Sequence, residues 1–236
     1  MLFFWSGMKT FKLLGKFTKF EIFLLTFSLT TITTFFRIFD RKGYLNYFVS
    51  LLGAVALIFC AKGNPIGQVF IIIFSTLYSI ISYKCAYFGE LATYAGMTLP
   101  MAVISLISWL KNPSNENGAE VKVNTLKKRE YLIGVLLCGV VTLAFHFILK
   151  ALNTANLLVS TISIATSFFA AYLTFRRSPF YALAYALNDV VLIILWAFML
   201  AKNSSYISVL TCFIVFLLND LYGFINWKKL QKKQNK

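Results

Sequence analysis

Long apolar runs separated by short charged segments constrain the fold of this chain more than any other feature of its sequence. A helix that crosses the hydrocarbon core of a bilayer needs about 20 largely uncharged residues. The chain contains eight such runs, at residues 20–37, 43–61, 64–83, 86–109, 131–149, 155–175, 179–201 and 205–226. Open sheets and irregular loops cannot satisfy their backbone groups in lipid. We therefore predict an all-α integral membrane protein with eight transmembrane helices.

The composition excludes an ordinary soluble domain. Apolar residues make up 59% of the 236 residues and charged residues 13%, whereas a soluble domain carries about 25% charged residues. In a soluble protein a net charge of +15 would suggest nucleic-acid binding. Here the basic residues lie between the apolar runs instead of along one face, so no nucleic-acid partner is expected. The four cysteines lie singly, without the spacing of a metal or disulfide site.

The basic residues between the runs predict how the chain is oriented. With eight crossings both termini lie on the same side, and that side carries 17 of the 23 Lys and Arg residues. Cytoplasmic loops of membrane proteins are enriched in Lys and Arg. We therefore predict a multi-pass protein of the cell (cytoplasmic) membrane with both termini cytoplasmic. The basic N-terminus resembles that of a signal peptide, but no cleavage pattern follows Phe36, so the first run is retained as a helix.

A weak internal repeat groups the predicted helices. Spans three and seven each open with a basic residue and a proline, at Lys62 to Pro65 and Arg176 to Pro179, and spans four and eight each end on a Trp before a lysine. The repeat predicts two three-helix bundles joined by one helix and preceded by an extra helix. The segments are a basic cytoplasmic N-terminus (1–19), an extra helix (20–39), a first bundle (43–109), a cytoplasmic linker (110–130), a linking helix (131–149), a second bundle (155–227) and a basic cytoplasmic tail (228–236).

The inventory of reactive residues argues against an enzyme. The chain has a single histidine, His146, and none of the usual metal-binding, nucleophile or phosphate-loop motifs. No catalytic residue, metal or cofactor is expected. His146, alone near one end of its span, is interpreted as a structural residue.

Polar and aromatic side chains at helical spacing identify a candidate binding site. Residues three or four positions apart share one face of a helix, and an amide near the middle of the bilayer needs a partner. The candidate substrate-binding residues are Tyr181, Tyr185, Asn188 and Trp196 in span seven, Asn219 and Tyr222 in span eight, Gln68 in span three, and Glu90 and Tyr94 in span four. The alternative interpretation is that these groups only hold helices together through hydrogen bonds.

Two further acids and several small residues are weighed separately. Asp189 and Asp220 each follow an Asn within a span, and an intramembrane carboxyl is a candidate for proton coupling or cation contact. Two acids and one distant histidine are too few titratable groups for a typical proton-transfer chain. Asp189 and Asp220 are therefore interpreted as residues that form structural hydrogen bonds or hydrogen bonds to the substrate. The serines of span six, Ser160, Ser163 and Ser167, are interpreted as close-packing residues.

Three stretches of the sequence resemble a known family. The run from Arg177 to Asp189 (RSPFYALAYALND), the pair Leu195 and Trp196, and the run from Leu218 to Trp227 (LNDLYGFINW) are similar to the PnuC family of vitamin transporters. The resemblance extends from about residue 40 to the C-terminus. It implies a SWEET-like fold of two three-helix bundles joined by a linker helix, with the substrate between them.

The resemblance also implies a function. Members of the family mediate facilitated uptake of nicotinamide riboside, which the cell then traps by phosphorylation. Many members carry two tryptophans three residues apart before the Asn of the seventh helix, where this chain has Tyr181 and Ala184. Another vitamin or nucleoside, such as thiamine, riboflavin or a deoxynucleoside, therefore stays an alternative substrate, and a non-transporting membrane scaffold is the alternative from another class. Membrane lipid and further copies of the chain are the other candidate partners.

Overall fold

The fold is a bundle of membrane-length helices, seen in a computed structural model that describes residues 17–39, 43–84, 88–114, 120–154, 156–201 and 207–235. Within these residues eight helical segments are long and apolar enough to cross a membrane, and no strand is present. The predicted all-α class is confirmed. The helices are α1 (Lys19–Phe39), α2 (Tyr44–Ala61), α3 (Ile66–Lys84), α4 (Phe88–Thr93) continuing through the π-helix η2 (Tyr94–Thr98) into α5 (Leu99–Leu110), α6 (Lys128–Ala151), α7 (Leu157–Phe175), α8 (Tyr181–Leu200) and α9 (Ile207–Gln234).

Two helices extend beyond their predicted ends. α6 begins at Lys128, where the Glu130 side chain accepts a hydrogen bond from the Lys127 backbone N–H at 2.8 Å and caps the first turn. α9 continues through Gln234, so most of the segment 228–236 that was predicted as a tail is helical. Its last turns are held because Leu230 is buried and Gln234 hydrogen-bonds the linker backbone at Val121 and Val123. Residues 1–16 of the predicted N-terminal segment lie outside the described residues.

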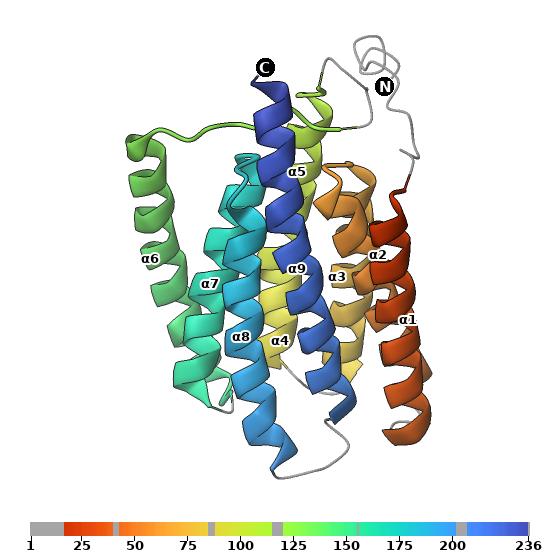
Figure 1. Ribbon diagram of the computed structural model, residues 1–236. Coiled ribbons are helices and arrows are strands. Elements are labelled where there is room, and N and C mark those ends of the chain that lie inside the picture. Colours follow the sequence, from red (N-terminus) through yellow and green to blue (C-terminus); the bar gives the residue numbers. More distant parts are fainter. Residues whose placement is uncertain are drawn as a thin grey trace, which may run out of the picture.

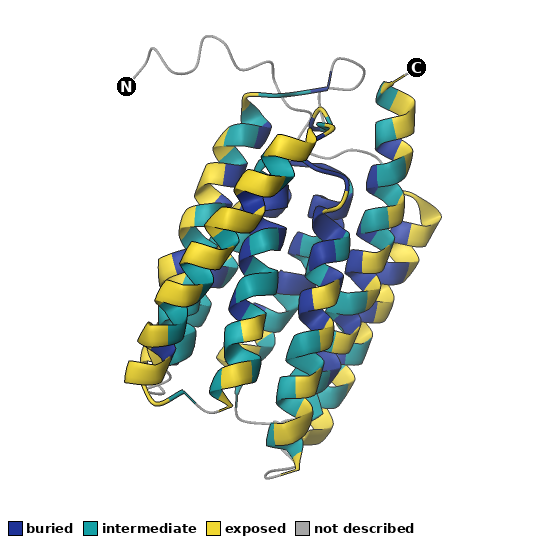
Figure 2. Ribbon diagram, turned by 90° about the vertical axis from the view of Figure 1, so that its left-hand side faces the viewer, coloured by how far each residue is buried: buried dark blue, intermediate teal, exposed yellow. Residues whose placement is uncertain are grey.

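The helices form two groups of three spans, with α1 and α6 at opposite edges of the bundle (Figure 1). α2, α3 and the α4–α5 segment make one group, and α7, α8 and α9 make the other. α9 packs against α2, and α5 packs against α7, so the third span of each group meets the first span of the other. Buried positions gather along the middle of the bundle, whereas α6 is largely exposed (Figure 2).

Matching hydrogen bonds join the two groups at the end of the bundle where α1 begins and α9 ends, called the terminal end below. The Trp109 indole N–H donates to the carbonyl of Thr174, and the Trp227 indole N–H donates to the carbonyl of Cys60, both at 2.9 Å. One position earlier, Ser108 donates to Phe175, and Asn226 donates to Ala61, both at 2.8 Å. In each group, a Trp of the third span therefore donates a hydrogen bond to the end of the first span of the other group.

The turns that follow these first spans also match. Gly63, after α2, has a φ of 66°, and Arg177, after α7, has a φ of 56°, a left-handed backbone conformation that favours glycine. The side chain of the next residue accepts a backbone hydrogen bond from the residue two positions on in both cases: Asn64 Oδ1 accepts from Ile66 N–H at 2.9 Å, and Ser178 Oγ accepts from Phe180 N–H at 3.3 Å. The two groups are therefore built on the same local pattern at the terminal end.

Candidate functional site

A cavity of about 470 Å³ lies between the two groups of helices, within the roughly 300–1,000 Å³ typical of small-molecule sites. It is lined by residues of α2, α3, the α4–α5 segment, α6, α7, α8 and α9, and no described residue of α1 lines it. The exposed residues Asn153 and Asn156 line it at the end away from the termini, whereas the buried Tyr181 lines it towards the terminal end. The cavity therefore reaches the surface at the end opposite the termini.

The terminal end of the cavity is closed by an aromatic cluster. The Tyr181 ring meets Trp227 edge-on with ring centroids 4.7 Å apart and meets Trp109 at 6.4 Å. Trp109 and Trp227 are fully buried, and their indole N–H groups make the bonds between the two groups described above. The cluster and its hydrogen bonds separate the cavity from the terminal end.

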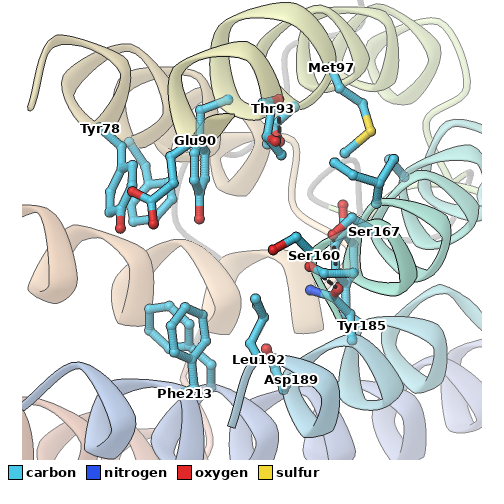
Figure 3. Close-up of a pocket in the computed structure, with 18 of the residues that line it drawn as sticks. Tyr78, Glu90, Thr93, Met97, Ser160, Ser167, Tyr185, Asp189, Leu192 and Phe213 are labelled. Carbon is cyan, nitrogen blue, oxygen red and sulfur yellow. Dashed lines mark hydrogen bonds between the residues drawn. The ribbon is translucent and has the colours of Figure 1, made fainter. Parts of the chain in front are cut away.

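One wall of the cavity, on α7 and α8, is rich in hydroxyl groups and one amide. Asn188 Oδ1 accepts hydrogen bonds from Thr166 Oγ1 at 2.8 Å, Ser167 Oγ at 2.9 Å and Ser163 Oγ at 3.3 Å. Ser160 lies one turn further along the same face of α7, and Figure 3 shows Ser160, Ser167 and Tyr185 along one side of the cavity. This wall offers groups that hydrogen-bond a polar, uncharged part of a ligand.

The facing wall combines aromatic rings with a carboxyl group. The ring centroids of Tyr78 and Tyr94 lie 4.3 Å apart, and the Glu90 carboxyl lies beside the Tyr78 hydroxyl. Figure 3 shows Tyr78 and Glu90 together across the cavity from Ser160 and Ser167. Tyr94 is the first residue of the π-helix. Pro100 has no backbone N–H, so it cannot donate the α-helical hydrogen bond to the Gly96 carbonyl. The helix is wider here, and the Leu99 N–H donates to the Tyr94 carbonyl, five residues earlier.

The charge of the lining is one-sided. Glu90, Asp189 and Asp220 line the cavity, and none of its described lining residues is Lys, Arg or His. The Asp189 and Asp220 carboxyl groups lie within hydrogen-bonding reach of each other. The described residues contain no group of three or more His, Cys, Asp or Glu side chains arranged to hold a metal ion.

The structure brings seven of the nine predicted site residues to the cavity and leaves two outside it. The seven are Gln68, Glu90, Tyr94, Tyr181, Tyr185, Asn188 and Trp196. Asn219 faces α1 and donates to Ser28 Oγ at 3.0 Å, and Tyr222 donates to Glu21 Oε1 at 3.0 Å. One position along a helix rotates a side chain by about 100°, so Asp220, not Asn219, lines the cavity.

Sequence reasoning missed part of the lining. The α7 serines were interpreted as packing residues, although Ser163 and Ser167 bond Asn188 and both line the cavity. Their three- and four-residue spacing opposite an intramembrane Asn was a usable signal. Tyr78 was not singled out, although it lies ten residues after Gln68 and close to the same face of α3. His146 bonds Thr161 Oγ1 at 3.1 Å between α6 and α7, away from the cavity lining.

A cavity with a few polar side chains, enclosed by membrane-length helices, is typical of solute transporters, and comparison with known proteins gives the family. The chain belongs to the nicotinamide mononucleotide transporter family, whose model matches residues 43–229. It is 26% identical over 229 residues to the nicotinamide riboside transporter PnuC of Neisseria mucosa, covering 95% of this chain and 86% of that protein. It is 25% identical over 194 residues to the nicotinamide riboside transporter PnuC of Haemophilus influenzae, and the match covers 82% of this chain and 83% of that protein.

The fold comparison agrees with the sequence comparison. A crystal structure of the vitamin B3 transporter PnuC matches with a TM-score of 0.80 and 26% identity, over 94% of this chain and 96% of that one. The resemblance to the PnuC family is confirmed, and the chain is a member of a family of transporters, not of enzymes. α1 lies before the first residue matched by the family model.

Proposed function

We propose that this protein carries nicotinamide riboside across the cell membrane. The observation that carries the proposal is the one-sided charge of the cavity, which has three carboxyl groups and no basic residue among its described lining residues. Nicotinamide riboside has a permanently cationic aromatic ring, a carboxamide and a ribose. Acidic and aromatic groups favour the ring, and hydroxyl and amide groups favour the ribose and carboxamide. The names of the PnuC relatives support the same substrate.

The same charge argues against the phosphorylated compound in the family's description. A phosphate monoester carries a charge of about −1.5 to −2 near pH 7 and is normally bound by Arg, Lys or helix N-termini. Three carboxyl groups in a low-dielectric cavity would repel it. The riboside therefore fits this lining better than the mononucleotide. Thiamine also carries a cationic ring and stays the second candidate, whereas riboflavin and deoxynucleosides lack that charge.

The direction of transport follows from the placement of the basic residues. Of the 17 Lys and Arg residues predicted to be cytoplasmic, those within the described residues lie at the terminal end. With that orientation both termini are cytoplasmic, and the cavity opens to the outside. Substrate would enter from outside and leave after the Trp109, Tyr181 and Trp227 cluster separates. The two groups of helices rock about the central site, which is alternating access.

Transport is passive in this proposal, and trapping inside the cell supplies the direction of net uptake. The test uses purified protein in proteoliposomes with radiolabelled nicotinamide riboside. The internal concentration should rise to the external one and stop, with or without a pH gradient. Competition with unlabelled mononucleotide, thiamine, riboflavin and a deoxynucleoside ranks the substrates. Accumulation driven by a pH gradient would overturn the passive mechanism, and a protein that binds none of these compounds would be a scaffold.

A further inference from the structure

The aromatic and acidic wall of the cavity has the composition of a cation site. Tyr78 and Tyr94 have ring centroids 4.3 Å apart, and Phe74 lies 5.8 Å from Tyr78 and 5.9 Å from Tyr94. All three rings line the cavity and are partly exposed. Glu90 lines the cavity beside the Tyr78 hydroxyl (Figure 3). A carboxyl group beside aromatic faces attracts a flat cation through both its charge and the ring quadrupoles.

The other aromatic and acidic groups of the cavity have different partners. Tyr181 is 3% exposed and packs against Trp109 and Trp227 in the cluster that closes the terminal end. Asp189 and Asp220 lie close to each other. Of the three carboxyl groups in the described lining, Glu90 is the one that lies beside both Tyr78 and Tyr94.

The two walls face each other across the cavity (Figure 3). The α7–α8 wall presents Asn188 with Ser160, Ser163 and Ser167, which suit hydroxyl groups, and its one acid, Asp189, lies close to Asp220. A ligand with a cationic ring at one end and hydroxyl groups at the other therefore matches the cavity in one orientation.

We propose that Glu90, Tyr78 and Tyr94 form a subsite that binds the cationic aromatic ring of the substrate, and that this subsite sets the preference for charged over neutral ligands. This inference rests on the proposed function, since it assigns an orientation to the substrate named there. The ring lies against the α3 and η2 wall, and the ribose lies against the α7–α8 wall. The low-dielectric surroundings strengthen the attraction between the ring charge and Glu90.

The experiment compares two ligands that differ in the ring charge. Nicotinamide riboside is cationic, whereas its dihydro form keeps the carboxamide and ribose but has a neutral ring. Their dissociation constants are measured by calorimetry on full-length protein in detergent, for wild type, Glu90→Gln, Tyr94→Leu and Tyr94→Phe. Glu120→Gln is the matched control, because Glu120 lies outside the spans and outside the cavity.

We expect Glu90→Gln to weaken binding of the cationic riboside by about tenfold or more, since it removes a charge-assisted contact in a desolvated site. Binding of the dihydro form should change less than about twofold, which also reports that the variant is folded. Tyr94→Leu should lower the preference for the cation, and Tyr94→Phe should retain it because the ring remains. Glu120→Gln should match wild type for both ligands.

The outcomes separate this inference from the proposed function. If wild-type protein binds neither form of the riboside, the proposed function is wrong. If wild type prefers the cation and Glu90→Gln keeps the same preference, the function stands and the subsite is wrong. The subsite would also be wrong if Asp189→Asn lost the preference for the cationic riboside while Glu90→Gln kept it. If Tyr94→Phe and Tyr94→Leu lost the preference for the cationic riboside equally, the aromatic ring of Tyr94 would not be the group that contacts the substrate.

Discussion

At the residue scale, two Asn-Asp pairs with the same sequence have different surroundings. Asn188 lines the cavity and accepts three hydroxyl hydrogen bonds, whereas Asn219 is buried against α1 and bonds Ser28 and its own helix. The pairs allow the two interpretations of an intramembrane amide, ligand binding and helix association, to be tested within one protein.

Replacing each Asn by Ala should separate binding from stability. Asn188→Ala should raise the dissociation constant for nicotinamide riboside about tenfold, because a hydrogen-bonding group of the cavity is lost. Asn219→Ala should leave that constant unchanged and lower the free energy of unfolding by about 1–2 kcal/mol, because Ser28 loses its buried partner. Calorimetry gives the first quantity, and unfolding in detergent by denaturant gives the second. A loss of affinity in Asn219→Ala without loss of stability would contradict the assignment.

The sequence predicted which residues line the cavity best where several polar groups marked one face of a helix. Tyr181, Tyr185 and Asn188 share such a face on α8 and line the cavity. On α9 two polar faces compete, one with Asn219 and Tyr222 and the other with Asp220. Periodicity cannot rank them, because only the position of α1 decides which face meets a neighbouring helix and which meets the cavity.

At the scale of the elements, α1 and α6 are joined to the two groups of helices by matching ion pairs. Glu21, in the first turn of α1, pairs with Lys62 after α2 at 3.1 Å, and Glu130, in the first turn of α6, pairs with Arg176 after α7. Each Glu side chain also caps its own helix. The extra N-terminal helix therefore makes the same kind of contact as the linking helix, which the sequence did not predict.

The two ion pairs should differ in their contribution to stability because they differ in exposure. The side chains are 10% and 4% exposed for Lys62 and Glu21, and 32% and 24% exposed for Arg176 and Glu130. Removing one partner of a buried pair costs about 3–5 kcal/mol, whereas an exposed pair contributes about 0–1 kcal/mol. Glu21→Gln should therefore destabilise the protein by several times more than Glu130→Gln in denaturant unfolding. Equal losses would mean that burial does not govern these contacts.

Other features of the elements needed the three-dimensional structure. The sequence predicted one continuous helix over 86–109, but Pro100 produces the π-helix that places Tyr94 in the cavity. The segment 110–130 was predicted as a linker on the basis of its polar residues. Its described part packs on the terminal end, where Val121 is fully buried and its N–H bonds the Gly63 carbonyl at 2.9 Å. A proline shows that a helix bond is lost, but not how the helix compensates.

At the scale of the whole molecule, the cavity is closed at one end and reaches the surface at the other. The closure is built from contacts between the two groups of helices, namely the Trp109 and Trp227 indole hydrogen bonds and the Tyr181 ring that packs against both tryptophans. Release of a substrate at the terminal end must break these contacts, so they hold the conformation described here. Whether this conformation accepts substrate from outside depends on the orientation of the bundle in the membrane.

The proposed orientation predicts which introduced cysteines react with a charged maleimide that cannot cross the bilayer. Phe88 lines the cavity at the start of α4, and Lys229 is exposed near the end of α9 at the terminal end. In a background without the native cysteines, Phe88→Cys should be labelled in intact cells. Lys229→Cys should be labelled only after permeabilisation. The 17 basic residues on the terminal side require this result under the positive-inside rule. The reverse pattern would place the closed end outside, and the conformation described here would then be the one that releases substrate to the cytoplasm.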